Sequence, residues 1–162
     1  MNDRITYSPI GIIHSPFTEP AGTPIQPPGA DGAGGEVEVF TDYAEGLEDL
    51  NKFSHIILLY HFHLAKTTPL RVKPFMDDHY HGVFAMRGPG RPNSIGLSVV
   101  SLERIDRNIL HVRDLDIIDG TPLLDIKPYV PAFDARTKVK IGWLESNVDK
   151  LKGTRDDGRF TD

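Results

Sequence analysis

The sequence predicts a mostly β protein, a small antiparallel β-barrel with one or two short helices. Its apolar and β-branched residues gather in about seven to nine short runs, separated by Pro, Gly, Asn and Asp. Helical periodicity is confined to short stretches. No glycine-rich turn joins a strand to a helix, which argues against a doubly wound nucleotide-binding sheet.

Composition sets the class of protein. The chain has 162 residues, enough for one domain with a sizeable core, and 39% of them are hydrophobic. It has no cysteine, which excludes disulfides, thiol catalysis and thiolate metal sites. No apolar run approaches the ~20 residues that span a bilayer, and Met1–Arg4 is unlike the start of a signal sequence. We therefore expect a cytoplasmic protein with no membrane segment.

The formal net charge of -5 argues against a nucleic-acid-binding surface that covers the whole molecule. The charge is uneven, however. Arg71, Lys73, Arg87 and Arg91 fall within 21 residues and predict a local basic patch.

The individual elements follow from local patterns. The most apolar run, 53–64, predicts a central strand buried on both faces. Residues 15–35 are rich in Pro and Gly and predict a stiff lid, and 43–50 predicts helical turns with Asp42 as N-cap. The predicted strands cover residues 7–14, 36–40, 53–64, 83–86, 95–105, 109–112 and 123–129.

After these strands the chain becomes polar, so we divide it into a barrel domain, 1–136, and a polar C-terminal extension, 137–162. Trp143 and Leu144 are expected to anchor a short helix in this extension. Residues 153–162 are expected to form a frayed tail.

The stretch 82–98, Gly-Val-Phe-Ala-Met-Arg-Gly-Pro-Gly-Arg-Pro-Asn-Ser-Ile-Gly-Leu-Ser, predicts a binding loop between two strands. Its glycines allow close approach of the backbone to a ligand, and its prolines make it stiff. Arg87 and Arg91 supply guanidinium groups suited to carboxylate or phosphate, and Asn93 adds an amide.

Four histidines offer another chemistry. His61 and His63 share one face of a predicted strand, and His79 and His81 repeat that spacing. If the four imidazoles converge, they form a metal site inside a barrel; otherwise they are packed or solvated.

Carboxylates are dense late in the chain, at Asp114, Asp116, Asp119 and Asp125. They suit a cationic ligand, ribose hydroxyls or a catalytic base, or they lie on the solvent face of edge strands. Lys127 and Tyr129 follow Asp125 at even spacing and so share its side of a strand.

Several separate motifs together resemble those of the TsaA-like (TrmO, formerly YaeB) family. They are Ile-Gly-Ile-Ile-His-Ser-Pro at 10–16, Gly-Leu-Glu at 46–48 with Phe-Ser-His at 53–55, Phe-His at 62–63, the loop 82–98, and Asp-Gly-Thr-Pro at 119–122 with Asp-Ile-Lys-Pro-Tyr at 125–129. The resemblance covers about residues 10–133. The sequence departs from the family pattern at Ser94, where Pro is usual, and at Gly90, where a bulkier residue is usual.

The resemblance implies a homodimeric β-barrel enzyme. It implies methyl transfer from S-adenosylmethionine to N6 of threonylcarbamoyladenosine at position 37 of tRNA, beside the anticodon. Because longer relatives carry a further C-terminal domain, we expect RNA affinity here to come from the dimer surface.

Site residues follow from the same resemblance. The cofactor-binding positions are Pro28, Gly29, His63, Leu64, Arg87, Leu97, Arg113, Asp114, Leu115 and Asp116. The residues expected to face the acceptor are Asn93, Asp125, Lys127 and Tyr129, with Arg91, Asn93 or Lys127 holding the substrate and Asp125 or Asp119 as a base. No metal is expected in this scheme. Two alternatives stay open: a metal-dependent barrel enzyme using His61, His63, His79 and His81, and a non-catalytic module that binds S-adenosylmethionine or RNA.

Overall fold

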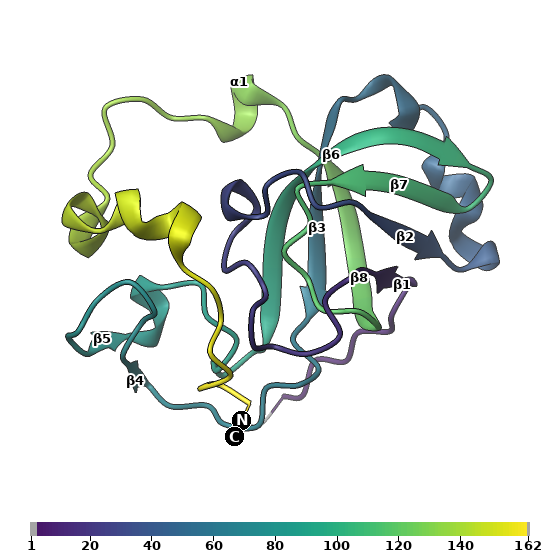
Figure 1. Cartoon of the computed structure of the whole chain (residues 1–162). Helices are drawn as coiled ribbons and strands as arrows, with labels where there is room; N and C mark the ends of the chain where they lie inside the picture. Colours follow the sequence, from purple (N-terminus) through teal and green to yellow (C-terminus); the bar gives the residue numbers. More distant parts are fainter. Residues whose placement is uncertain (1–2, 162) are drawn as a thin grey trace.

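Six antiparallel strands close into a barrel, as the sequence predicts. The computed structural model describes residues 3–161. The strands are, in order around the barrel, β1 (Gly11–His14), β2 (Gly35–Val39), β7 (Ile109–Arg113), β6 (Ile95–Asp106), β3 (His55–His61) and β8 (Thr121–Pro128). A separate two-stranded sheet pairs β4 (Arg71–Val72) with β5 (His81–Gly82) beside the barrel (Figure 1).

Alternation along the strands fills the barrel interior. Ile56 and Leu58 of β3 point inward and are fully buried, as are Val100 and Leu123 of its two neighbours. Burial of β3 on both faces was therefore a wrong prediction. The outer face of the strand is only half-buried, because in a small closed barrel a single inner face supplies the core.

Within residues 3–161, helical structure is limited to segments of three to seven residues. The turns predicted at 43–50 are confirmed as 3₁₀ helices η2 (Thr41–Leu47) and η3 (Leu50–Lys52), although no side chain caps η2. The strand predicted at 83–86 is wrong, because Val83–Ala85 forms the 3₁₀ helix η4. The other short helices are η1 (Pro27–Gly29), α1 (Pro131–Asp134), η5 (Gly142–Ser146) and η6 (Val148–Gly153).

A second apolar cluster lies outside the barrel and explains why residue 83 leaves the β conformation. Val83 packs there with Val72 and Phe160, and all three are nearly fully buried. The ring of Phe160 stands edge-on to Phe75, with centroids 5.1 Å apart. The frayed tail predicted for 153–162 is therefore wrong for 153–161, while residue 162 lies outside the described part of the chain.

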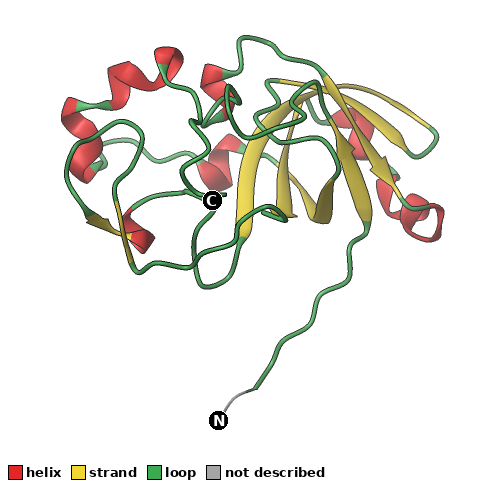
Figure 2. Cartoon of the chain, turned by 60° about the horizontal axis from the view of Figure 1, so that its bottom comes forward, coloured by secondary structure: helices red, strands yellow, loops and turns green. Residues whose placement is uncertain are grey.

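The C-terminal segment is also tied to the Pro- and Gly-rich loop. The N–H of Asp156 donates to Thr23 O (2.9 Å), and the N–H of Gly22 donates to Asp156 O (2.8 Å). Pro24 and Arg155 form an isolated β-bridge. Figure 2 shows the result, with the barrel strands on one side and the β4–β5 sheet and C-terminal helical turns on the other. Within 3–161, no helix has the length and apolar character needed to cross a bilayer.

Candidate functional site

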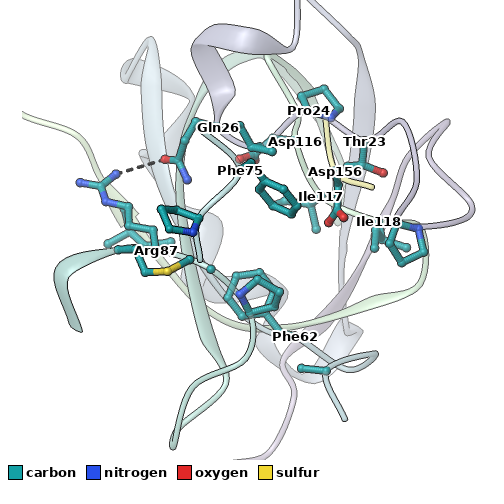
Figure 3. A pocket seen from close by; sticks show the side chains of 18 of the residues that line it. Thr23, Pro24, Gln26, Phe62, Phe75, Arg87, Asp116, Ile117, Ile118 and Asp156 are labelled. Atoms are coloured by element: carbon teal, nitrogen blue, oxygen red, sulfur yellow. Dashed lines mark hydrogen bonds between the residues drawn. The ribbon is translucent and has the colours of Figure 1, made fainter. Parts of the chain in front are cut away.

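A cavity of about 460 Å³ lies between the barrel and the C-terminal segment. Its walls come from distant parts of the chain, which Figure 3 shows converging on one space. They are residues 20–26, 60–65, 74–76, 84–89, 97, 116–121 and 143–161 in part. Most of the lining is apolar, with aromatic side chains such as Phe62, Phe75 and Trp143. Cavities of about 300–1,000 Å³ with apolar walls and a few polar groups are typical of small-molecule sites.

A chain of hydroxyl groups holds the carboxylate of Asp116 at the cavity wall. Ser98 Oγ donates to Asp116 Oδ1 (2.6 Å). Because that donation uses the only serine proton, the Tyr60 hydroxyl donates to Ser98 Oγ (2.9 Å). Burial raises the pKa of Asp116 to about 7, although the bond from Ser98 and the charge of Arg87 lower it in part. Burial and the nearby Asp116 raise the pKa of Tyr60, which keeps that phenol protonated.

Arg87 reaches the same cavity from the loop 82–98. Its Nη1 donates to Gln26 Oε1 at 3.3 Å (Figure 3). Arg87 takes part in no salt bridge within residues 3–161. Its side-chain hydrogen-bond partner there is the neutral amide of Gln26. A guanidinium in this position suits a carboxylate or phosphate of a ligand.

Arg91, by contrast, supports the loop itself. Its Nη1 donates to Met86 O (2.9 Å) and to Gly88 O (3.4 Å), and Ser94 Oγ donates to Arg91 O (3.3 Å). These bonds connect the loop to itself between residues 86 and 94. Asn93 lies exposed on the outer part of the loop.

Half of the expected cofactor-binding residues meet at the cavity: His63, Leu64, Arg87, Leu97 and Asp116. Burial and the neighbouring His61 lower the pKa of His63, so this imidazole is neutral at pH 7. Its Nδ1 lies 3.3 Å from the hydroxyl of Thr121, which donates to Ile118 O.

The other half lie outside the cavity lining. Pro28 and Gly29 form η1, where Gly29 packs closely against the backbone of Leu151. Leu115 is fully buried in the barrel core. Arg113 pairs with Glu103, and Asp114 accepts a hydrogen bond from Ser101 (3.0 Å).

The acceptor-side residues of β8, and Tyr129 directly after it, lie on the outer surface of the barrel. Lys127 Nζ forms a salt bridge with Asp125 Oδ2 (2.7 Å). Tyr129 stands edge-on to His55, with ring centroids 6.3 Å apart. None of these side chains lines the cavity, so within one chain the acceptor-side group and the cofactor-side group are separate.

The four histidines do not converge. His79 and His81 both contact the carboxylate of Asp77, at 3.2 and 2.8 Å, in the small sheet. His61 and His63 lie at the end of a barrel strand instead. Across residues 3–161 no group of three or more His, Cys, Asp or Glu side chains is arranged to hold a metal ion, so the four-histidine alternative is not favoured.

Sequence reasoning missed the wall supplied by the C-terminal segment. Trp143, Leu144, Val148, Leu151 and Asp156 all line the cavity. The signal was present in the sequence, because the four apolar residues recur at helix-like spacing within an otherwise charged stretch.

A family model, curated relatives and solved structures all match this chain, and they point to the same family. Residues 12–135 match the family model described as tRNA-methyltransferase O N-terminal domain. The chain is 62% identical over 156 residues to a probable S-adenosyl-L-methionine-binding protein of Pyrococcus abyssi, covering 96% of this chain and 85% of that protein. It is 35% identical over 150 residues to the tRNA (adenine(37)-N6)-methyltransferase of Escherichia coli, covering 86% of this chain and 64% of that enzyme. A crystal structure of TrmO from Pseudomonas aeruginosa superposes with a TM-score of 0.74 at 40% identity, covering 88% of this chain and 62% of that one. The chain thus spans less than two thirds of the length of these two bacterial proteins.

Proposed function

Since the chain belongs to the tRNA-methyltransferase O family, we propose that it methylates N6 of threonylcarbamoyladenosine at position 37 of tRNA, with S-adenosylmethionine as methyl donor. One observation carries the proposal. A guanidinium, Arg87, and a carboxylate, Asp116, line the same cavity, whose walls are otherwise mostly apolar. These are the groups that a zwitterionic amino-acid moiety and a nucleoside need.

The residues present fit S-adenosylmethionine. Arg87 would bind the methionine carboxylate, because its charge has no carboxylate partner within residues 3–161. Asp116, oriented by Ser98, would accept from the ribose hydroxyls. Phe62 and Leu97 would cover the apolar parts and exclude water. When bound, the cofactor supplies a methyl group on a sulfonium, which is reactive once donor and acceptor are aligned.

The acceptor-side residues would act from the outer surface. Asp125 would take the N6 proton, and Lys127 would hold the threonyl carboxylate while staying close to Asp125. Arg91 is less suited to that contact, because it already bonds the loop backbone. Asn93 and Tyr129 would complete the acceptor site.

A homodimer would unite the two groups. The outer face of β3 and β6 presents an apolar stripe of Ile57, Leu59, Ile95, Leu97 and Val99, in which Ile57 is opposite Val99 and Leu59 is opposite Leu97. Leu97 is 42% exposed there and also lines the cavity. A second copy seated on this stripe would cover its apolar surface and bring the acceptor-side residues of one protomer towards the cavity of the other.

RNA contact is supported by local rather than net charge. Arg136, Lys138 and Lys140 are exposed, and no acidic residue lies between them. They suit phosphates of the anticodon stem and loop, which a cytoplasmic enzyme would meet.

The proposal is tested in two steps. Isothermal titration with S-adenosylmethionine should give saturable binding near one site per chain. Incubation with tRNA that carries threonylcarbamoyladenosine should then add one methyl group to that nucleoside, detected by mass spectrometry of the digested RNA, and tRNA that lacks this modification should remain unmethylated. Binding without any methyl transfer would instead identify a non-catalytic module.

A further inference from the structure

Asp156 is a second carboxylate in the cavity, and it comes from outside the region that matches the family model. Figure 3 shows its side chain in the same space as Asp116, on the side away from Arg87. The function proposed above does not use this residue, and the resemblance did not include it.

The position of Asp156 is fixed by its backbone. Its N–H and C=O both pair with the Pro- and Gly-rich loop, at Thr23 O (2.9 Å) and Gly22 N (2.8 Å). The side chain of Thr23 is buried and bonds Glu19 O (2.8 Å), so the loop is itself held in place. Pairing on both sides of residue 156 sets the direction of its Cβ.

Part of the carboxylate remains available to a ligand. Asp156 Oδ1 accepts the N–H of Gly158 (2.7 Å). The nearby cation, Arg159, is bound to Asp157 through Nε and Nη2, and its Nη1 donates to the backbone of Lys73 and Pro74. Among the salt bridges of residues 3–161 there is none to Asp156. Burial raises the pKa of Asp156, as expected for a carboxyl group without a direct cationic partner.

When both of its carboxyl groups are ionised, above about pH 7, the cavity has an excess of negative charge. Two carboxylates, Asp116 and Asp156, face one guanidinium, Arg87, in a mostly apolar space. Electrostatic interactions are stronger there than in water. Such a site favours a ligand that carries more positive than negative charge.

We propose that the carboxylate of Asp156 contacts the sulfonium of S-adenosylmethionine, and that this contact makes the site prefer the methyl donor to its thioether product, whose sulfur carries no charge. The inference rests on the proposed function. The α-ammonium group is bonded to the same carbon as the carboxylate that Arg87 holds, so it stays near Arg87. The sulfonium lies further along the molecule, and Asp156 lies on the side of the cavity away from Arg87.

The test compares three ligands by isothermal titration: S-adenosylmethionine, S-adenosylhomocysteine and 5′-methylthioadenosine, which lacks the amino-acid moiety. Asp156→Asn should lose about tenfold in affinity for S-adenosylmethionine and little for the other two. The matched control is Asp149→Asn, an exposed acid of the same segment outside the cavity; it should bind all three as the wild type does.

Other patterns would overturn the inference. Unchanged binding of S-adenosylmethionine by Asp156→Asn excludes the contact. Equal losses for all three ligands indicate a purely structural role, and equal losses for the first two alone indicate an ammonium contact. Asp156→Glu retains the charge and should keep the preference for the donor even if its affinity falls. Failure of the wild-type protein to bind S-adenosylmethionine would refute the proposed function itself, which separates the two failures.

Discussion

Gly96 and Tyr60 are direct cross-strand partners, and the ring of Tyr60 occupies the position that a Cβ at residue 96 would take. This arrangement directs the Tyr60 hydroxyl to Ser98 and, through it, to Asp116. The absence of a side chain at Gly96 therefore helps to fix the position of the Asp116 carboxylate at the cavity wall.

Gly96→Ala is expected to displace the Tyr60 ring and to lower the free energy of unfolding by about 1–3 kcal/mol. It should also weaken binding of S-adenosylmethionine, because the hydroxyl chain to Asp116 is disturbed. Urea unfolding and titration measure the two effects. Gly46→Ala is the matched control, since a Cβ there meets open space; equal effects of both substitutions would contradict the explanation.

Cofactor binding should depend on pH through Asp116. Its pKa in the folded protein is about 7, so the carboxylate becomes ionised as pH rises through that value. Affinity for the cationic cofactor should accordingly be weaker at pH 6 than at pH 8. Titration at several pH values checks this, and Asp116→Asn should flatten the profile. A wild-type affinity that does not change between pH 6 and 8 would remove Asp116 from the site.

The same group should lower stability as pH rises. The unfolded chain releases the proton of Asp116 near the ordinary value of 3.8, whereas the folded chain holds it to about 7. Between these values the folded state binds more protons, so its contribution to stability is present below about pH 4 and is lost by about pH 7. Asp116→Asn should therefore raise the free energy of unfolding at pH 8 by up to about 4 kcal/mol, since a shift of one pKa unit corresponds to about 1.4 kcal/mol. Thermal unfolding at pH 5 and pH 8 measures the difference, which should be larger at pH 8.

Arg87→Ala should weaken binding of S-adenosylmethionine by roughly 1.5–3 kcal/mol, the range for a lost hydrogen bond to a charged group. Isothermal titration gives the value directly. Arg104→Ala, an exposed arginine of β6 outside the cavity, serves as the control and should bind normally. An unchanged dissociation constant for Arg87→Ala would show that another residue holds the carboxylate.

Asp125→Asn should slow methyl transfer by about 10²–10⁴-fold, the contribution typical of a general base. Affinity for S-adenosylmethionine should stay the same, because Asp125 lies outside the cavity. Stability should change little, since its pair with Lys127 is solvent-exposed. Single-turnover assays with tRNA, next to cofactor titration, separate the two steps. A full rate of transfer would leave Asp119 as the candidate base.

Phe160→Ala should loosen the C-terminal segment without unfolding the barrel. Phe160 belongs to the cluster with Val72 and Val83, which is separate from the barrel core. Removing such a ring costs about 3–5 kcal/mol at the site. Hydrogen exchange should rise in 143–161 and stay low in the barrel strands, and cofactor affinity should fall. Equal loss of protection in the barrel would mean that the C-terminal segment and the barrel unfold together.

The barrel could be predicted from the sequence because its information is local. The hairpin of β6 and β7 follows from two alternating runs around Asp106, Arg107 and Asn108, and the structure confirms it. Asp116 and Arg87 were identified as cofactor-side residues through the family motifs, but their shared cavity depends on closure of the barrel.

The second apolar cluster, formed by Val72, Val83 and Phe160, could not be predicted from local patterns. Phe160 is one aromatic residue in a charged stretch, and its partners, Phe75 and Val72, lie more than 80 positions earlier. Val83 sits in a run with high β propensity, yet packing against that distant ring favours a 3₁₀ turn. A contact made by one aromatic residue with segments so far away adds nothing to the periodic pattern of the residues around it.

The bridge between Pro24 and Arg155 also has a consequence for protein synthesis. The last barrel strand ends at Pro128, so a nascent chain can close the barrel while residues 143–161 are still inside the ribosome. The backbone hydrogen bonds that join the loop around Thr23 to Asp156 can form only after Asp156 leaves the ribosome. A ribosome-bound chain would accordingly hold a folded barrel before the C-terminal wall of the cavity is available to a ligand.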